Sequence, residues 1–199
     1  MKICKDFIED NTITSIEQWK ELCPPAHKNQ WVIGRSAFES ARFWLRAENH
    51  NLVKKVLINH FHKIDFQLAA PEFKTPFDQN GGNDRNHDLF IKALDSKGNI
   101  FIGIEAKVDE PFGDVIAKTF IDASAKKIEK PESKSLKRII DLSKNIDLGN
   151  SDLFWGLRYQ LAYSIAGLIA HSKIEEVSRA LFLVQTFKTN KYDKKKSRH

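Results

Sequence analysis

Residues 87–113, HDLFIKALDSKGNIFIGIEAKVDEPFG, form the stretch that decides the fold. Two runs rich in Ile, Leu and Phe, residues 87–95 and 100–108, flank the short connection Ser96-Lys97-Gly98-Asn99. Apolar runs of this length on both sides of a Gly-containing connection are typical of a β-hairpin. The stretch therefore predicts two adjacent antiparallel strands.

The alternation of side chains along a strand assigns these residues to two faces of the hairpin. One face of each strand is wholly apolar, and its members are Leu89, Ile91, Ala93, Ile100, Ile102, Ile104 and Ala106. A slip of one residue would move one of the two apolar sets out of the core. We therefore predict the register that pairs Asp95 with Ile100 and Leu89 with Ala106, so that both sets point the same way.

The same register brings three charged residues together on the other face, at the end away from the turn. Asp88 then lies opposite Lys107, and Glu105 lies two residues earlier on the second strand. Cross-strand and diagonal neighbours are about 5 to 8 Å apart, so we expect one cluster. Gly103 lies beside it, and its missing side chain permits a close approach by another group.

Two carboxylates at this separation suit a hard divalent cation, Mg²⁺ or Mn²⁺, because oxygen ligands bind it and the cation removes their mutual repulsion. The lysine can orient a water molecule or neutralise charge that develops on a phosphate, as in metal-assisted phosphodiester hydrolysis. The alternative is a solvated strand end, where Lys107 pairs with one of the acids and contributes little.

The remaining residues alternate between helical and extended patterns. Helices are expected from a Thr14 or Ser15 cap to residue 22 and over 36–45, 52–61, 114–130, 136–142 and 152–172, and further strands over 64–70 and 180–187. This order predicts a mixed α/β domain with a sheet of about four strands flanked by helices. We expect one domain over residues 1–187, including a helical extension over residues 1–30.

Composition bounds the class of protein. The chain has 199 residues and a formal charge of +6. Residues 188–199 hold six basic residues and one acid, so we expect a flexible tail of charge +5, which raises non-specific affinity for nucleic acid, and a body of only +1. Two cysteines, a charged N-terminus and the lack of an apolar run of about 20 residues predict a cytoplasmic protein with free thiols and no membrane segment.

The pattern resembles the PD-(D/E)XK nuclease superfamily, whose motif is an acid on one strand followed by Glu or Asp, any residue, and Lys on the next. Here these are Asp88 and Glu105-Ala106-Lys107. More narrowly, the chain is similar to an uncharacterised bacterial family within that superfamily. The similarity covers about residues 31–187, in the stretches GRSAFESARFW, APEFKTPF, NHDLF, IEAKVDEPFG, LRYQL and ALFLVQTF.

The resemblance implies a restriction-endonuclease-like core and an Mg²⁺- or Mn²⁺-dependent nuclease that hydrolyses DNA phosphodiesters. Asp88 and Glu105 would hold the cation, assisted by the Ala106 carbonyl, and Lys107 would position the attacking water. The alternative is a catalytically silent module of the same fold that binds nucleic acid or a protein partner. A homodimer is compatible with either function.

Three further residues are candidate accessories. Placed on one helix over 152–172, Arg158 falls on the apolar face, where it either reaches the cluster or extends to solvent. Helix geometry therefore favours Arg158, whereas the resemblance to the superfamily keeps Gln160, on the opposite side of that helix, as a second candidate. Glu39 resembles first-helix acids of the superfamily that supply a third metal ligand, but an exposed helix residue is the preferred interpretation. Glu72, after the strand over 64–70, is interpreted in the same way as a residue outside the site.

Two other patterns suggest sites but are better explained without one. His60 and His62 are two residues apart on a helix and point to opposite sides, so we assign them no site. The lysine runs at 126–127 and 134–138 are interpreted as solvated helix faces, with phosphate contacts as the alternative.

Overall fold

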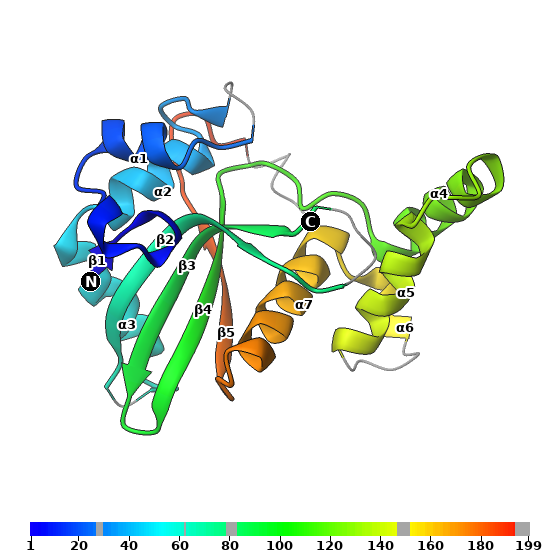
Figure 1. Ribbon diagram of the computed structural model, residues 1–199. Helices are drawn as coiled ribbons and strands as arrows, with labels where there is room; N and C mark the ends of the chain where they lie inside the picture. The colour runs from blue at the N-terminus through cyan, green and yellow to red at the C-terminus, as the bar shows by residue number, and fades with distance from the viewer. Residues whose placement is uncertain (27–29, 62, 79–82, 147–151, 194–199) are drawn as a thin grey trace.

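A five-stranded mixed sheet organises the chain in a computed structural model that describes residues 1–26, 30–61, 63–78, 83–146 and 152–193 (Figure 1). Its strands, in spatial order, are β1 (Lys2–Ile3), β2 (Asp65–Thr75), β3 (Arg85–Asp95), β4 (Gly98–Lys107) and β5 (Ala180–Thr186). The β1–β2 and β4–β5 pairs are parallel, and the two pairs between them are antiparallel. The predicted mixed α/β class is confirmed.

The N-terminal segment adds a strand that the sequence did not predict. β1 pairs with Leu68 and Ala69 of β2, so the expected extension over residues 1–30 belongs partly to the sheet. The short 3₁₀ helices η1 (Lys5–Phe7) and η2 (Glu9–Asn11) then lead to α1 (Ile16–Leu22). Ser15 caps α1, as predicted, because its side chain accepts a hydrogen bond from the Gln18 amide.

The hairpin has the predicted faces but a register shifted by two residues. Asp95 pairs with Gly98 and Leu89 with Ile104, so the predicted pairing of Asp95 with Ile100 is wrong. The connection is only two residues long, and the Asp95 carboxylate accepts a hydrogen bond from the Lys97 amide at 2.7 Å. Gly98 adopts a φ of +109°, which favours glycine. A shift of two residues keeps every side chain on its face.

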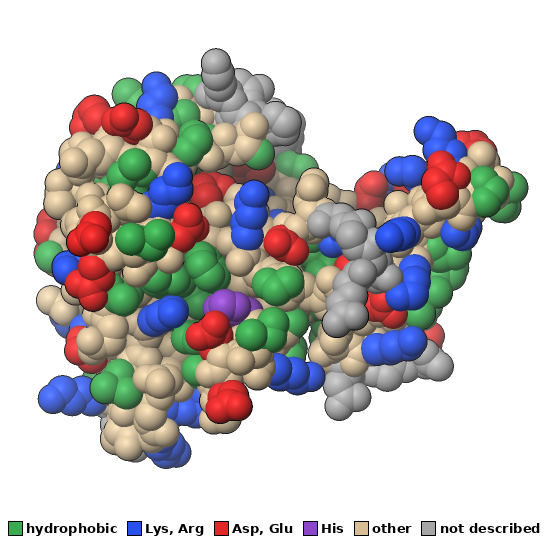
Figure 2. Space-filling view, viewed as in Figure 1, with side chains coloured by type: hydrophobic (Ala, Val, Ile, Leu, Met, Phe, Trp, Pro, Cys, Tyr) green, Lys and Arg blue, Asp and Glu red, His purple; other side chains and the backbone are tan. Residues whose placement is uncertain are grey.

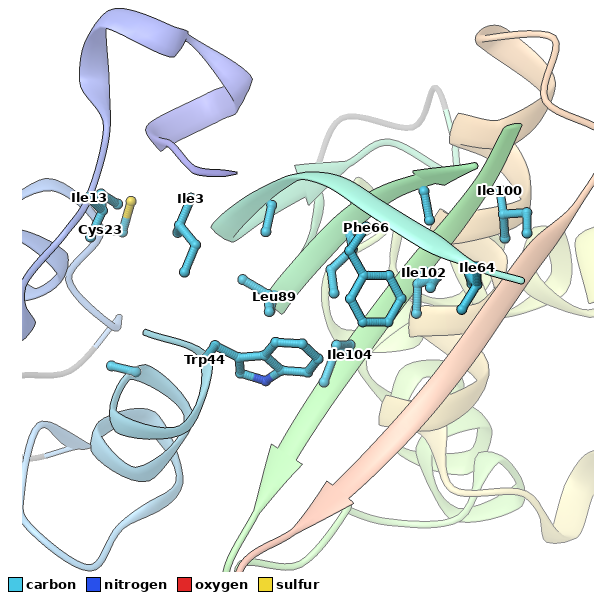
Figure 3. Close-up of a cluster of buried hydrophobic side chains, with 14 of the residues drawn as sticks. Ile3, Ile13, Cys23, Trp44, Ile64, Phe66, Leu89, Ile100, Ile102 and Ile104 are labelled. Carbon is cyan, nitrogen blue, oxygen red and sulfur yellow. The ribbon is translucent and has the colours of Figure 1, made fainter. Parts of the chain in front are cut away.

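Helices α1, α2 (Ser36–Trp44) and α3 (Ala47–Leu57) cover one face of the sheet (Figure 1). Trp44 points from α2 toward Leu89 and Ile104 of the hairpin (Figure 3). Its indole nitrogen also donates to Gln185 of β5 at 2.9 Å. The apolar face deduced from alternation therefore forms the sheet side of the main hydrophobic core.

Helix α7 (Tyr159–Ile174) packs on the opposite face of the sheet. There Leu168 forms a small core with Phe90 and Phe101. A Cβ atom added at Gly103 would lie 3.0 Å from Nδ1 of His87. The close approach expected at Gly103 is thus made by a buried imidazole.

The predicted single helix over residues 152–172 is wrong. It is divided into α6 (Asp152–Gly156) and α7, and Arg158 between them has extended backbone angles. The Ile116 amide donates to the Leu157 carbonyl at 2.8 Å, and the Tyr159 amide donates to the Asp114 carbonyl at 2.9 Å. These bonds to another segment prevent residues 157–158 from continuing a helix.

Helices α4 (Ile116–Glu129) and α5 (Ser135–Ile146), together with α6, form a helical lobe beside the sheet, with its own apolar cluster (Figure 1). Helix α7, with 16 residues, is the longest helix of the described residues. No helix in the described part of the chain has both the length and the apolar character needed to cross a membrane.

Several elements differ from their predicted limits. The helix expected over 52–61 is α3, which begins at Ala47 and ends at Leu57, so His60 lies beyond its end. β2 continues past Pro71 to Thr75, because β1 reaches only to Ala69 and proline therefore faces no partner strand on that side. Part of the expected flexible tail is bound to the body, since Thr189 donates to the Gly34 carbonyl and the Asp193 amide donates to Asp109. Residues 194–199, like His62, lie outside the described residues.

Candidate active site

A cavity of about 490 Å³ opens at the end of the sheet away from the hairpin turn. Its charged and amide side chains from the sheet and α7 are Glu72, Arg85, Asn86, Asp88, Glu105, Lys107 and Gln160. The start of α2 and the segment after β4 close it with Arg35, Ser36 and Glu110. The structure therefore brings Asp88, Glu105 and Lys107 into one cavity, as the hairpin faces predict.

Glu105 is the centre of the cluster, and its side chain is only 2% exposed. One carboxylate oxygen, Oε1, lies 2.9 Å from the Lys107 ammonium and accepts a hydrogen bond from Gln160 at 2.5 Å. The other oxygen, Oε2, forms an ion pair with Arg85. Lys107 also donates to the Gln160 side-chain carbonyl at 3.2 Å. Two cations and one amide thus hold this buried carboxylate in place.

Asp88 lies level with Glu105 when the observed register is continued, rather than opposite Lys107. Its Oδ2 accepts a hydrogen bond from the Ala106 amide at 2.6 Å. Burial, together with the negative charge of Glu105, raises the pKa of Asp88 to about 7. Negative charge is therefore crowded at this end of the hairpin, and a bound cation would favour the ionised form of Asp88.

Glu72 is a third carboxylate in the cavity, which the sequence interpretation treated as an outsider. The pairing of Pro71 with Leu89 and of Phe73 with His87 places it level with Asp88. Burial and the charge of Asp88 raise the pKa of Glu72 to about 8. The expected strand ended at Pro71, which left Glu72 unplaced. The residues before and after Glu72 both pair with β3, so a strand predicted to continue past Pro71 would have placed Glu72 beside Asp88.

The sequence analysis missed Arg85 because the regular alternation of side chains along β3 is interrupted before the strand reaches the cavity. Strict alternation places His87 and Phe90 on opposite faces, yet His87 and Leu168 both border the space at Gly103, on the α7 side. Glu72, on the paired strand, has a φ of +51° at this level. The irregularity turns Arg85 toward α7 and the cavity, which no pattern in the sequence indicates.

The accessory candidates separate clearly. Gln160, in the first turn of α7, contacts both Glu105 and Lys107. Arg158 is not among the residues that line the cavity, and it donates to the Gly113 carbonyl at 3.0 Å. The geometric preference for Arg158 over Gln160 is therefore wrong, because it assumed one continuous helix through both residues.

Glu39 is neither exposed nor part of the cavity. It is 4% exposed, accepts a hydrogen bond from the Gly34 amide at 3.0 Å and pairs with Arg42 at 2.8 Å. The preferred interpretation as an exposed helix residue is wrong, because this carboxylate binds the turn that precedes α2. The placement also removes Glu39 as a third ligand beside Asp88 and Glu105.

The oxygen atoms in the cavity fit a hard divalent cation that takes few of its ligands from the protein. Among the described residues, no three His, Cys, Asp or Glu side chains converge as a metal-binding group. Mg²⁺ requires no such group, because one or two carboxylates hold it while it keeps several waters. The Asp88 and Glu105 carboxylates meet that requirement once Glu105 releases Arg85 or Lys107, and Ala106 also lines the cavity.

Comparison with known proteins places the chain in a family. The family model of a domain of unknown function, DUF6946, matches residues 12–197. The chain belongs to this family. No curated protein and no solved structure matches the chain. The match spans every element of this DUF6946 protein that lines the cavity.

Proposed function

We propose that this DUF6946 protein is an Mg²⁺- or Mn²⁺-dependent nuclease that hydrolyses phosphodiester bonds of DNA. The observation that supports the proposal is the convergence of Asp88, Glu105 and Lys107, held by Gln160, in one cavity. Asp88 and Glu105, with the Ala106 carbonyl, would hold the cation. When bound, it supplies Lewis-acid polarisation of the phosphodiester.

Lys107 is positioned for a direct role at the phosphate. Its ammonium group is held between Glu105 Oε1 at 2.9 Å and Gln160 Oε1 at 3.2 Å, and its side chain is 12% exposed. A fixed, desolvated ammonium orients the attacking water and stabilises charge that develops on the phosphate oxygens. Gln160 acts through Lys107 and Glu105 as a positioning residue.

Arg85 adds a second cation on the other side of Glu105. A guanidinium binds phosphate oxygens in a bidentate manner as readily as it binds a carboxylate. An entering phosphodiester therefore competes with Glu105 for Arg85, and the exchange would release the carboxylate for the cation.

A plasmid-nicking assay with Mg²⁺ or Mn²⁺ tests the proposal. We expect cleavage by the wild type and a loss of at least about 100-fold in Lys107→Ala and Asp88→Ala. Arg158→Ala is the matched control: it removes a nearby basic side chain outside the cavity and should leave cleavage unchanged. Full activity in Lys107→Ala or Asp88→Ala would contradict the proposal.

A catalytically silent module is the second candidate, because Arg85, Lys107 and Gln160 already occupy both oxygens of Glu105. A cluster satisfied in this way can be purely structural. Calorimetric titration with Mn²⁺ separates the two functions. A nuclease should bind Mn²⁺, and Asp88→Asn should abolish the binding, whereas no heat of binding in the wild type favours the silent module.

A further inference from the structure

The positive charge of the folded domain is concentrated in one projecting pair of helices. We define the arm as residues 116–146, which are α4, α5 and their connection. The arm contains eight Lys and Arg residues and four acids, a net charge of +4. Residues 1–187 carry only +1, so the domain outside the arm is net negative at −3. The arm is therefore the basic surface of the body.

Three lysines at the tip of the arm are available to a partner. Lys126, Lys130 and Lys134 are all exposed. Within the described part of the chain, their ammonium groups form no ion pair or side-chain hydrogen bond, whereas Lys118 pairs with Asp114 and Lys137 with Asp141. Exposed lysines without an acidic partner bind anions at little cost, because no internal ion pair has to be broken.

The base of the arm lies next to elements that carry the candidate active site. The segment after β4, the strand that carries Glu105 and Lys107, leads directly into α4. On the other side, Arg138 of α5 donates to the Tyr163 hydroxyl of α7 at 2.8 Å, one turn after Gln160. Figures 1 and 2 show the arm projecting away from the sheet, with Lys and Arg side chains gathered on it.

The length of the arm suits an extended polyanion. Helix α4 has 14 residues, which corresponds to about 21 Å at 1.5 Å per residue. Duplex DNA presents one phosphate per about 1.7 Å of its axis, so roughly twelve phosphates fall within that span. On α4, about 100° per residue places Lys126 on the side opposite the exposed Ile121 and Ile128, and Lys130 follows the last residue of the helix. A partner bound by charge is thus separate from one bound by apolar contact.

We propose that the arm binds the sugar–phosphate backbone of double-stranded DNA beside the cavity. The proposal rests on the proposed nuclease function and adds to it the surface that holds the substrate outside the cleaved bond. Lysine side chains contact phosphates as point charges and release counterions, so the binding is independent of sequence and falls with salt.

Fluorescence anisotropy with a labelled DNA duplex, in EDTA so that no cleavage occurs, tests this surface on the full chain. The variant Lys126→Glu/Lys130→Glu/Lys134→Glu is compared with Lys20→Glu/Lys97→Glu/Lys173→Glu, which makes the same charge change at exposed lysines outside the arm. We expect the tip variant to bind at least about 10-fold more weakly and the slope of log K against log salt to fall by about 2 to 3. The control should lose less than about 3-fold. Unchanged thermal unfolding of both variants verifies their folding.

Equal losses in the two variants, no binding by the wild type, or tighter binding of single-stranded DNA or RNA than of the duplex would overturn the proposal. Lys107→Ala keeps this test separate from the nuclease assignment. If neither the wild type nor Lys107→Ala cleaves, yet binding still depends on the tip lysines, the nuclease proposal is wrong and the proposal that the arm binds DNA is supported. If the tip variant cleaves and binds as the wild type does, the arm fails and the nuclease stands.

Discussion

Replacing Asp88 with asparagine should make the protein more stable at pH 8 while it abolishes cleavage. Burial and the charge of Glu105 raise the pKa of Asp88 from 3.8 to about 7. The folded state therefore binds this proton more tightly than the unfolded state. The resulting stabilisation is fully present below about pH 4 and is lost as the pH rises through 7. Asparagine removes the charge and still accepts the hydrogen bond from the Ala106 amide.

The magnitude follows from the size of the shift. The difference between 3.8 and about 7 corresponds to about 4 kcal/mol as an upper limit. Asp88 is partly exposed to the cavity, and solvent screens its charge, so we expect about half of that value, about 2 kcal/mol, at pH 8. For a protein of this size, 2 kcal/mol corresponds to a rise of about 4 to 8 °C in Tm.

Thermal unfolding followed by circular dichroism, in EDTA between pH 5 and pH 8, measures the effect. Asp10→Asn is the matched control, because it removes one exposed carboxylate that does not line the cavity. We expect Asp88→Asn to unfold above the wild type at pH 8 and the difference to shrink toward pH 5. A Tm at or below that of the wild type at pH 8, or a difference independent of pH, would refute the reasoning.

Three further predictions concern the same site. Mn²⁺ should raise the Tm of the wild type more at pH 8 than at pH 6, because the cation competes with the Asp88 proton, and should leave Asp88→Asn unchanged; equal protection of both proteins would contradict a site at Asp88. Glu105→Gln should cost about 3 to 5 kcal/mol in urea denaturation, since it leaves the cations of Arg85 and Lys107 without their carboxylate, while exposed Glu129→Gln should cost less than 1 kcal/mol. Gly103→Ala should lower the free energy of unfolding by about 1 to 3 kcal/mol, because its Cβ would press on the buried His87 ring. Gly156→Ala is the control, since a Cβ there meets no atom within 4 Å and should not incur that packing cost. An equal loss of stability in the two variants would disprove the contact.

Local patterns were sufficient for the hairpin and the acids on it. Alternation within residues 87–95 and 100–108 assigned Asp88, Glu105 and Lys107 to one end of one face, and the structure brings them into one cavity. The register itself was predicted two residues away from that observed. The error left the faces intact because side chains along a strand return to the same face every two residues. A shift by an even number of residues therefore keeps Asp88, Glu105 and Lys107 together, whatever the length of the turn.

The rest of the site depends on contacts between segments far apart in the chain. Gln160 replaces Arg158 because residues 157–159 bond to residues 114–116, which ends one helix and begins another. Glu72 and Arg85 enter the cavity because two paired strands depart together from regular alternation at the level of Asp88. The sequence alone determined which face carries the chemistry, since strand periodicity is a local property. Which side chains complete it was decided by tertiary structure, because backbone pairing between distant segments overrides the local periodicity of each.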